Sequence, residues 1–368
     1  MVLISLDGMR HDYPDRVAGG AFSRLEQQGV RADRLEPPFP ASTFPAHVTL
    51  ATGCYPERHG ILNSRFLDRA RGEFDRSNDP SWIECEPIWV TAERQAVRSA
   101  VSNWIGSYGP WRGTEATYHE LRFVRRPDVE SVRKVMSWLR LPEESRPGLI
   151  LAYLAGADHA GHRYGPSAPE VTAQIRAEDR VLSVLLNALD SLPGRERITL
   201  VVLTDHGMAE RRGAADPLET LSQHGIRNRT YPSGGCANVY LVRQVDRERA
   251  RDLLMRIPGL EAYPGETLPS DLHYRNSGRT GDLVLLAAAG MELGGEKRDP
   301  SPRGVHGYRG TEKAMGGIFY AWGAGVNRGR RAGTIRAVDV VPLVCRLLRI
   351  RPSSQVQGRV PAGVLTTP

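Results

Sequence analysis

Six aspartate and histidine side chains, far apart in the sequence, are suited to holding metal ions at one catalytic site. These candidate ligands are Asp7, Asp158, His162, Asp205, His206 and His306. Carboxylate and imidazole groups in this mixture favour zinc or manganese over calcium, because calcium prefers ligands that are all oxygen. Two such ions can clamp the attacking and leaving oxygens of a displacement at phosphorus. The residue types therefore predict a two-metal phosphoryl-transfer site.

The spacing of Asp158 and His162 lets both side chains reach one ion, because residues four apart lie on the same face of a helix. A loop can also bring them together. By itself this short motif is a weak signal, and the plainer interpretation is a pair on the surface. Gly156, Gly161 and Gly165 surround the pair. They predict an irregular loop at a strand end, where metal ligands are commonly displayed.

Asp205 and His206 are adjacent at the end of a strongly apolar run. Adjacent residues on a strand point to opposite faces, so both can serve one site only if the chain turns there. Gly207 supplies the freedom for that turn. The plainer interpretation is that Asp205 caps a turn and His206 packs against it.

Ser42 and Thr43 precede a helix-like run at residues 45–50, so the plainer interpretation is that a hydroxyl caps this helix. The functional interpretation is a hydroxyl nucleophile, since backbone N–H groups and the helix dipole there stabilise an alkoxide and a bound phosphate. A hydroxyl is a weak nucleophile near neutral pH and needs a metal ion or a base. Of the other histidines, His59 is expected to order a loop near the site, and His47 is a weaker candidate.

Apolar runs and helical spacing predict the elements that position these residues. Continuous apolar runs, typical of strands buried on both faces, occur at residues 2–6, 149–154, 198–203 and 317–322. Apolar residues at helical spacing occur at residues 129–139, 168–189 and 338–348. Strands that alternate with helices predict an α/β fold with a mostly parallel central sheet. Sites in such sheets form at the carboxyl ends of strands, where Asp7, Asp158 and Asp205 lie.

Residues 213–303 have a different pattern, with several Pro and Gly turn signals and two strand candidates, at 237–242 and 282–287. We expect these residues to form a small subdomain inserted into the same domain. Residues 1–212 and 304–368 would then form the catalytic core.

The composition is that of an ordinary globular protein, with 40% hydrophobic and 25% charged residues among 368. The net charge of +7 comes from scattered basic residues. It predicts a solvated surface with some attraction for anionic substrates, and no nucleic-acid-binding module accompanies it. No GxGxxG motif follows the first strand, which excludes a dinucleotide-dependent oxidoreductase as far as sequence can.

The four cysteines are far apart, so we expect neither a disulfide framework nor a zinc–thiolate site. They are Cys54, Cys85, Cys236 and Cys345. No apolar run is long enough for a membrane span. Because the first residues already form a strand pattern rather than a signal peptide, the sequence as it stands predicts a cytoplasmic protein. A truncated start would instead be compatible with secretion.

Sequence blocks along nearly the whole chain resemble the type I phosphodiesterase/nucleotide pyrophosphatase family of the alkaline phosphatase superfamily. In family order, the blocks are residues 3–10, 43–47, 52–61, 87–89, 104–107, 153–166, 204–208, 279–282 and 304–308. The resemblance implies an alkaline phosphatase-like fold. It also implies that Thr43 is the nucleophile and forms a phosphothreonine intermediate.

The resemblance further implies two Zn²⁺ ions, with Mn²⁺ as the alternative. Asp158, His162 and His306 are similar to the ligands of one ion. Asp7, Asp205 and His206 are similar to the ligands of the other, to which Thr43 also binds.

Two positions depart from the family pattern. Ser64 stands where the family usually has an asparagine that donates to a phosphate oxygen, so either Ser64 or the preceding Asn63 is expected to make this contact. Ala157 replaces a proline before Asp158. Phe44 matches a family aromatic position that suits a nucleobase, Tyr118 and Tyr153 are candidates for a similar role, and packing in the core is an equal alternative for all three.

The sequence thus predicts a hydrolase of phosphodiester or pyrophosphate bonds that acts on small, anionic, nucleotide-like substrates. A phosphomonoesterase or a phosphonate hydrolase of the same superfamily is the first alternative. A metal-binding relative without activity is the second, and the complete set of ligands with Thr43 argues against it.

Overall fold

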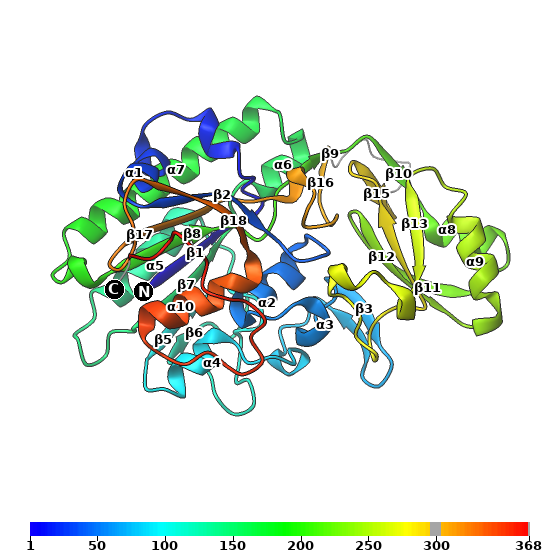
Figure 1. Cartoon of the computed structure of the whole chain (residues 1–368), viewed down its shortest axis with the longest axis horizontal. Helices are drawn as coiled ribbons and strands as arrows, with labels where there is room; N and C mark the ends of the chain where they lie inside the picture. Colours follow the sequence, from blue (N-terminus) through cyan, green and yellow to red (C-terminus); the bar gives the residue numbers. More distant parts are fainter. Residues whose placement is uncertain (295–302, 367–368) are drawn as a thin grey trace.

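The computed structural model describes residues 1–294 and 303–366, and within them the largest unit is a central sheet of eight strands (Figure 1). The strand order is β18-β2-β17-β8-β1-β7-β5-β6. In that order the strands span Arg330–Arg336, Val30–Glu36, Phe319–Gly323, Thr199–Leu203, Val2–Leu6, Leu149–Leu154, Ser99–Ser102 and Tyr118–His119. β17 is antiparallel to both of its neighbours, and the other neighbouring pairs are parallel. This confirms the mostly parallel α/β fold that the sequence predicts.

Successive side chains of β1 and β8 enter two different hydrophobic clusters, because side chains alternate between the faces of a strand. In β1, Leu3 belongs to one cluster and Ile4 to the other, and Val201 and Val202 divide in the same way in β8. Every residue of both strands is buried. Continuous apolar runs are what strands covered on both faces require.

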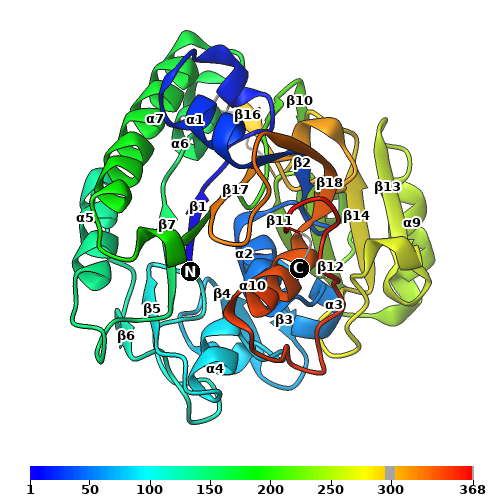
Figure 2. The same ribbon diagram turned by 60° about the vertical axis from the view of Figure 1, so that its left-hand side comes forward.

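Helices cover both faces of the central sheet (Figure 2). α1, α5 and α7 contribute to the cluster that holds Ile4, and α2, α4 and α10 contribute to the cluster that holds Leu3. In that order the helices span Gly20–Gln28, Asp128–Leu139, Pro169–Asp190, Thr43–Thr52, Ile88–Glu93 and Val340–Leu348. α5, α7 and α10 lie where the spacing of apolar residues predicts helices. None of the helices in the described part of the chain has both the length and the apolarity of a membrane span.

A second sheet, which is antiparallel and has four strands among the described residues, lies within the second-sheet region, residues 213–294 (Figure 1). Its strands β11-β12-β14-β13 span Asn228–Ser233, Cys236–Leu241, Leu283–Ala287 and Leu260–Pro264, and α8 (Pro217–Gln223) and α9 (Arg247–Leu254) pack against them. The sequence pattern located β12 and β14 but missed β11 and β13. Each missed strand contains a proline, which argues against a strand. The division into a core and an inserted subdomain stays a prediction.

Three pairs of short strands complete the sheets of the described residues. They are β3 (Arg65–Asp68) with β4 (Gly72–Asp75), β9 (Ala209–Glu210) with β16 (Gly304–Val305), and β10 (Gly213–Ala215) with β15 (Met291–Leu293). The second pair matters for function, because His206 lies shortly before β9 and His306 directly follows β16. Their pairing brings two histidines that are distant in sequence to the same place.

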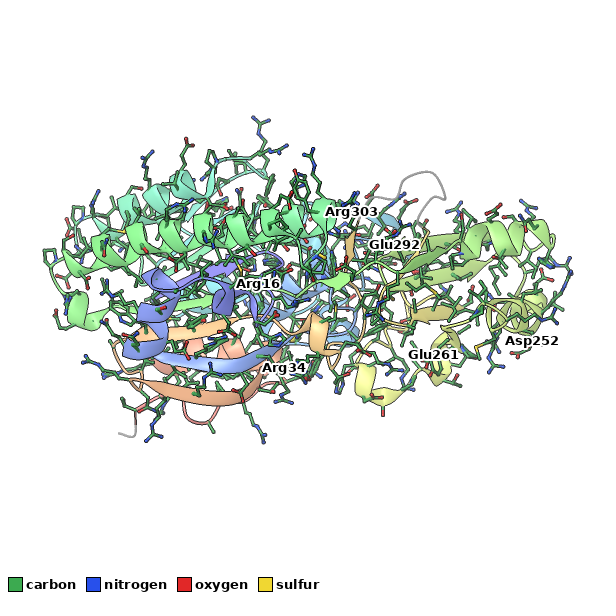
Figure 3. All side chains as sticks on the ribbon, turned by 90° about the horizontal axis from the view of Figure 1, so that it is seen from above. Arg16, Arg34, Asp252, Glu261, Glu292 and Arg303 are labelled. Carbon is green, nitrogen blue, oxygen red and sulfur yellow. A yellow bond between two sulfur atoms is a disulfide. The ribbon has the colours of Figure 1, made fainter. Side chains whose placement is uncertain are left out.

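Charged side chains project from both parts of the molecule (Figure 3). Arg34 in the core pairs with Glu36 at 3.1 Å, and Glu261 in the second-sheet region pairs with Arg309 at 3.3 Å. The first pair is partly buried, and Glu261 of the second is exposed, so charged side chains reach the solvated surface that the composition predicts.

Cys54 and Cys85 form a disulfide, and this corrects the sequence-based expectation that none is present. Cys54 follows α2 and Cys85 precedes α4, and the two helices pack in the same hydrophobic cluster. The expectation was wrong because a separation of 31 residues carries no local signal for pairing. Cys236 and Cys345 are buried thiols.

Candidate active site

Three aspartates lie together at one edge of the central sheet, at the carboxyl ends of the neighbouring strands β8, β1 and β7. Asp205 follows β8 and Asp7 follows β1, whereas Asp158 begins the short helix α6 (Asp158–Tyr164) after β7. Parallel neighbouring strands end at the same edge, so residues from three distant parts of the chain meet there. The sequence argument located this edge correctly. The segment expected to be an irregular loop is, however, the helix α6.

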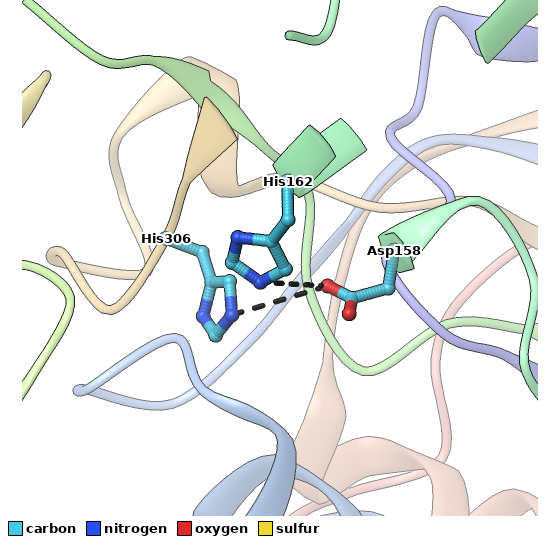
Figure 4. Close-up of side chains that lie close together, drawn as sticks. All are labelled: Asp158, His162 and His306. Carbon is cyan, nitrogen blue, oxygen red and sulfur yellow. Dashed lines mark ion pairs between the residues drawn. The ribbon is translucent and has the colours of Figure 1, made fainter. Parts of the chain in front are cut away.

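Asp158, His162 and His306 form one cluster of possible metal ligands, whose ligand atoms all lie within 4.8 Å of one another. His162 Nε2 is 3.3 Å and His306 Nε2 is 3.9 Å from Asp158 Oδ1 (Figure 4). Asp158 and His162 are one turn apart on α6, so the helix presents both to the same point.

Asp7, Asp158 and His206 form a second cluster within the same distance limit, and Asp158 therefore joins the two clusters. His206 Nε2 is 3.6 Å from Asp7 Oδ1 and 3.3 Å from Asp205 Oδ2. The rings of His206 and His306 are stacked, with centroids 3.8 Å apart. The structure thus brings together all six residues that the sequence singles out.

The three histidines present the same nitrogen to the site. In each ring Nδ1 lies within hydrogen-bond distance of a backbone carbonyl: His162 with Gly304 O at 2.8 Å, His206 with Gly207 O at 2.9 Å, and His306 with Ala41 O at 3.1 Å. A ring that donates its Nδ1–H to a carbonyl has an Nε2 lone pair available for a metal ion. Backbone carbonyls thus orient each ring as a metal ligand.

One carboxylate oxygen of each aspartate is buried without a hydrogen-bond partner among the described residues: Asp7 Oδ1, Asp158 Oδ1 and Asp205 Oδ2. Unpaired buried charge is costly. Burial and the neighbouring charges of Asp205 and Asp158 raise the pKa of Asp7 well above its usual value. Burial, together with His206 and His162, lowers the pKa of His306 to about 3, which keeps this ring neutral. Crowded carboxylates and a neutral imidazole fit a site for divalent cations.

Two glycines allow the backbone to come close at this edge. Gly8 has φ +65°, and a Cβ there would lie 2.7 Å from Asp158 Cα. Gly156 has φ +57°, and a Cβ there would lie 2.3 Å from Asp7 O. Asp7 O in turn accepts a hydrogen bond from Asp158 N at 3.1 Å. Only glycine combines this conformation with this closeness, so Gly8 and Gly156 fix the distance between Asp7 and Asp158.

Thr43 begins α2, and its Oγ1 lies 3.1 Å from His206 Nε2. Ser42 occupies the N-cap position but makes no side-chain hydrogen bond to the helix, so the capping role expected from the plainer interpretation is not observed. The Thr43 hydroxyl is therefore placed beside the second cluster and at the positive end of a helix.

His47 lies closer to the site than the sequence indicates. It is fully buried on α2, and its Nδ1 lies 2.9 Å from Thr43 O and 3.3 Å from Asp205 Oδ2. Its Nε2 lies 2.9 Å from Ser5 Oγ. The available signal was its spacing of four residues from Thr43, which places both on one face of a helix. His59 orders the following turn, as expected, since its Nδ1 accepts a hydrogen bond from Ile61 N.

The candidate substrate-binding residues differ in the contacts that their side chains already make within the protein. Tyr153 donates its hydroxyl to Asp7 Oδ2 at 2.7 Å, so it is tied to the metal cluster. Phe44 is partly buried and packs edge-on against Phe74, with centroids 6.0 Å apart. Asn63 is fully buried and its Oδ1 accepts from Ser64 N, whereas its Nδ2 has no hydrogen-bond partner in the described chain. Asn63 therefore has a free donor.

Comparison with known proteins identifies relatives over nearly the whole chain. The family model for type I phosphodiesterase/nucleotide pyrophosphatase matches residues 1–309. An uncharacterized pyrophosphatase/phosphodiesterase of Schizosaccharomyces pombe is 31% identical over 374 residues, covering 95% of this chain and 76% of the relative. Human ectonucleotide pyrophosphatase/phosphodiesterase family member 1 is 29% identical, and the match covers 96% of this chain but only 40% of the human protein. The chain thus spans less than half of the length of this larger relative.

Solved structures with the same fold include human ectonucleotide pyrophosphatase/phosphodiesterase 5. It superposes with a TM-score of 0.90 at 25% identity and covers 100% of both chains. The mouse counterpart, in an inactive threonine-to-alanine variant bound to AMP, superposes with a TM-score of 0.88 at 25% identity. That match covers 96% of this chain and 95% of the mouse chain.

Proposed function

Because the chain belongs to the type I phosphodiesterase/nucleotide pyrophosphatase family and is a hydrolase of that type, we propose that Thr43 is its nucleophile. In this proposal the enzyme cleaves phosphodiester or pyrophosphate bonds of nucleotide-like substrates through a phosphothreonine intermediate. The observation that carries it is the Thr43 hydroxyl, 3.1 Å from His206 Nε2 at the start of α2. The inactive threonine variant of the mouse relative, which binds AMP, supports a threonine nucleophile and a nucleotide substrate.

The proposed cofactors are two Zn²⁺ ions, with Mn²⁺ as the alternative. Asp158, His162 and His306 would hold one ion, and Asp7, Asp205 and His206, with Thr43, would hold the other. The unpaired carboxylate oxygens and the inward Nε2 atoms fit this ligand set. When bound, the ions would supply positive charge that favours the ionised Thr43 hydroxyl and offsets charge on the phosphoryl group.

In the proposed reaction Thr43 Oγ1 forms a bond to phosphorus while the bond from phosphorus to the leaving oxygen breaks. The leaving group departs with that electron pair and takes up a proton in place of the one that the Thr43 hydroxyl releases to solvent. Water then cleaves the phosphothreonine ester, which restores the Thr43 hydroxyl and releases the second phosphate product. The backbone N–H groups at the start of α2 stabilise negative charge during both steps.

We propose that Asn63, rather than Ser64, donates to a non-bridging phosphate oxygen. Asn63 Nδ2 is the donor without a partner, whereas the Asn63 Oδ1 atom is occupied by Ser64 N. Phosphate binding should therefore be weaker in Asn63→Ala than in Ser64→Ala. A preference of the wild type for monoesters over diesters would instead favour the phosphomonoesterase alternative.

The test is a substrate panel with zinc-reconstituted enzyme: bis(p-nitrophenyl) phosphate, p-nitrophenyl phosphate, a dinucleotide, ATP and a phosphonate. Wild type should favour diester or pyrophosphate bonds. Thr43→Ala should lose activity by about 1,000-fold or more while its circular dichroism and metal content stay unchanged. Activity within about tenfold of wild type would show that Thr43 is not the nucleophile.

The Cys54–Cys85 disulfide supports an oxidising compartment rather than the cytoplasm. We therefore propose that the protein functions outside the reducing cytoplasm. Rapid acid quenching of cells followed by thiol alkylation tests this proposal. Alkylation of two cysteines per chain is expected, and alkylation of all four in unreduced protein would contradict it.

A further inference from the structure

Arg10, on the segment that follows Asp7, uses its whole guanidinium group for contacts within the protein. Its Nε and Nη2 atoms donate to the two carboxylate oxygens of Asp12, at 2.6 and 2.9 Å, and its Nη1 donates to Met208 O at 3.0 Å. The guanidinium also lies over the Tyr13 ring, 5.0 Å from the centroid. Arginine alone offers a two-pronged donor, a third donor and a flat face at once. These contacts hold the side chain in one position.

Tyr13 supports this arrangement through its ring rather than its hydroxyl. It is fully buried at the start of a short 3-10 helix, Tyr13–Arg16, and its hydroxyl has no hydrogen-bond partner in the described part of the chain. Arg16 also lies over the ring, 4.4 Å from the centroid, and its Nη1 donates to Pro166 O at 2.7 Å. Pro166 lies just after the end of α6. The ring and its two arginines therefore join the segment after β1 to the end of α6.

Met208, whose carbonyl accepts the hydrogen bond from Arg10, also packs against two other segments that carry candidate ligands. It is fully buried and lies two residues after His206. A Cβ on Gly161 would lie 3.0 Å from Met208 Cε, and a Cβ on Gly304 would lie 2.9 Å from Met208 Cγ. Gly161 directly precedes one candidate histidine ligand, and Gly304 lies two residues before another. The absence of side chains at both glycines lets Met208 approach α6 and β16 closely.

These contacts connect Arg10 to both candidate metal clusters. Asp7 and His206 of one cluster lie on the two segments that the hydrogen bond from Arg10 to Met208 joins. The other cluster is connected through the packing of the Met208 side chain. Groups that orient metal ligands without touching the ion raise metal affinity. Because both oxygens of Asp12 already pair with the guanidinium, its charge is not available to a substrate.

Resting on the proposed two-metal site, we infer that Arg10 is a positioning residue for that site. Through Met208 it sets where the candidate histidine ligands lie relative to Asp7, and Tyr13 keeps its guanidinium in place. Arg10 itself touches neither the ions nor the substrate. Loss of Arg10 therefore weakens metal binding and leaves the reaction unchanged once the ions are bound.

The test measures the zinc affinity of Arg10→Met by chelator competition and, separately, the stability of the metal-free protein by urea unfolding. Zinc affinity should fall about tenfold or more. Arg24→Met is the matched control, because Arg24 of α1 also lies over a ring, that of Trp322 at 5.6 Å, and pairs with Asp190 at 2.7 Å. This control should keep zinc affinity within about twofold of wild type, even where its stability falls.

Substitutions at Tyr13 and a milder one at Arg10 sharpen the test. Tyr13→Phe removes only the hydroxyl without a partner and should bind zinc as tightly as wild type, whereas Tyr13→Leu removes the ring and should lower zinc affinity about tenfold. Arg10→Lys keeps the positive charge but loses the two-pronged contact with Asp12, so its zinc affinity should stay closer to that of Arg10→Met than to that of wild type. Because Arg10→Lys leaves Asp12 with a cation, it decides the question where Arg10→Met does not fold.

Wild-type zinc affinity in either folded Arg10 variant, or equal losses in Arg10→Met and Arg24→Met, would overturn the inference. At saturating zinc, kcat/KM of Arg10→Met for bis(p-nitrophenyl) phosphate should return to within about threefold of wild type. A loss that persists there, mainly in KM, would assign Arg10 to substrate binding and overturn the positioning role.

The zinc measurements also separate this inference from the proposed function. A wild type that binds no zinc would refute the proposed cofactors, and this inference with them. A wild type that binds two zinc ions but cleaves no phosphate ester would refute the proposed reaction alone, and the zinc affinities of the variants would still decide the role of Arg10.

Discussion

Two of the regions that hold buried carboxylates differ in the groups that face those carboxylates. At the carboxyl ends of β8, β1 and β7, the aspartates of the candidate site have oxygens without hydrogen-bond partners in the described chain. At the junction between the core and the second-sheet region, Asp68 accepts a hydrogen bond from Arg279 Nε at 2.8 Å and others from Ala70 N and Arg71 N. Arg279 itself also bonds to Gly60 O.

The pKa values of Asp68 and Asp7 shift in opposite directions, whereas those of Asp158 and Asp205 are lowered because neighbouring histidines outweigh burial. Burial favours the neutral form of Asp68, but the hydrogen bond from Arg279 holds the pKa of Asp68 below its usual value. Burial and the neighbouring carboxylates raise the pKa of Asp7 well above its usual value. Asp68 therefore forms an ion pair within the protein, whereas the aspartates of the candidate site fit a site for an external cation.

The largest expected effect comes from removing one candidate metal ligand, Asp205. Asp205→Asn should lower kcat/KM by about 1,000-fold or more, because it removes a charged ligand beside Thr43. Bound zinc, measured by elemental analysis after reconstitution, should fall from two ions per chain. An Asp205→Asn enzyme that retains two tightly bound ions and near-normal activity would contradict the ligand assignment.

A substitution at Asp68 should change the stability of the fold rather than the rate of the reaction. Asp68→Asn weakens one partner of the buried Arg279 guanidinium, which keeps its ion pair with Glu84 at 2.9 Å, and should destabilise folding by about 2 kcal/mol. Urea unfolding measures this loss, and kcat of the folded fraction should stay close to that of the wild type. Asp75→Asn is the matched control, since the ion pair of Asp75 with Arg65 is exposed and should contribute less than about 1 kcal/mol.

His47 tests whether the candidate site depends on residues that do not touch the metal ions. His47→Leu removes the group that contacts Thr43 O and Asp205 Oδ2, so zinc affinity and kcat should fall about 10- to 100-fold. His47→Asn retains a donor in this position and should recover part of the loss. Equal losses in the two variants, or unchanged zinc affinity measured by chelator competition, would assign His47 to packing alone.

The smallest effect concerns a buried histidine of the core. Burial, with Arg279 nearby, lowers the pKa of His59 to about 3 in the folded protein, against an ordinary value near 6.5. Protonation therefore favours the unfolded chain. The stability from neutral His59 is fully present above about pH 6.5 and is lost as the pH falls toward 3, by about 1.4 kcal/mol per pH unit. Urea unfolding at pH 5.5 and 4.5 should show about this slope for wild type and a shallower one for His59→Asn, and equal slopes would contradict it.

Local patterns in the sequence were sufficient for much of the fold and for the family. The apolar runs that became β1, β7 and β8 predicted a buried parallel sheet, and the carboxylates after them predicted where the site lies. The family resemblance is confirmed by the match over residues 1–309. The roles of the individual ligands and of Thr43 stay predictions.

Other features depended on contacts between distant segments. The Cys54–Cys85 disulfide, the contact of His47 with Asp205 and the stacking of His206 on His306 join residues that no local period connects.

The sequence by itself determined the residue chemistry, the alternation of strands and helices, and the edge of the sheet at which the site forms, because these follow from local periodicity and from residue types. Only the tertiary structure decided which carboxylates remain unpaired. Pairing depends on whether the packing of distant segments brings an arginine, as at Asp68, or other carboxylates and a histidine ring, as at Asp7.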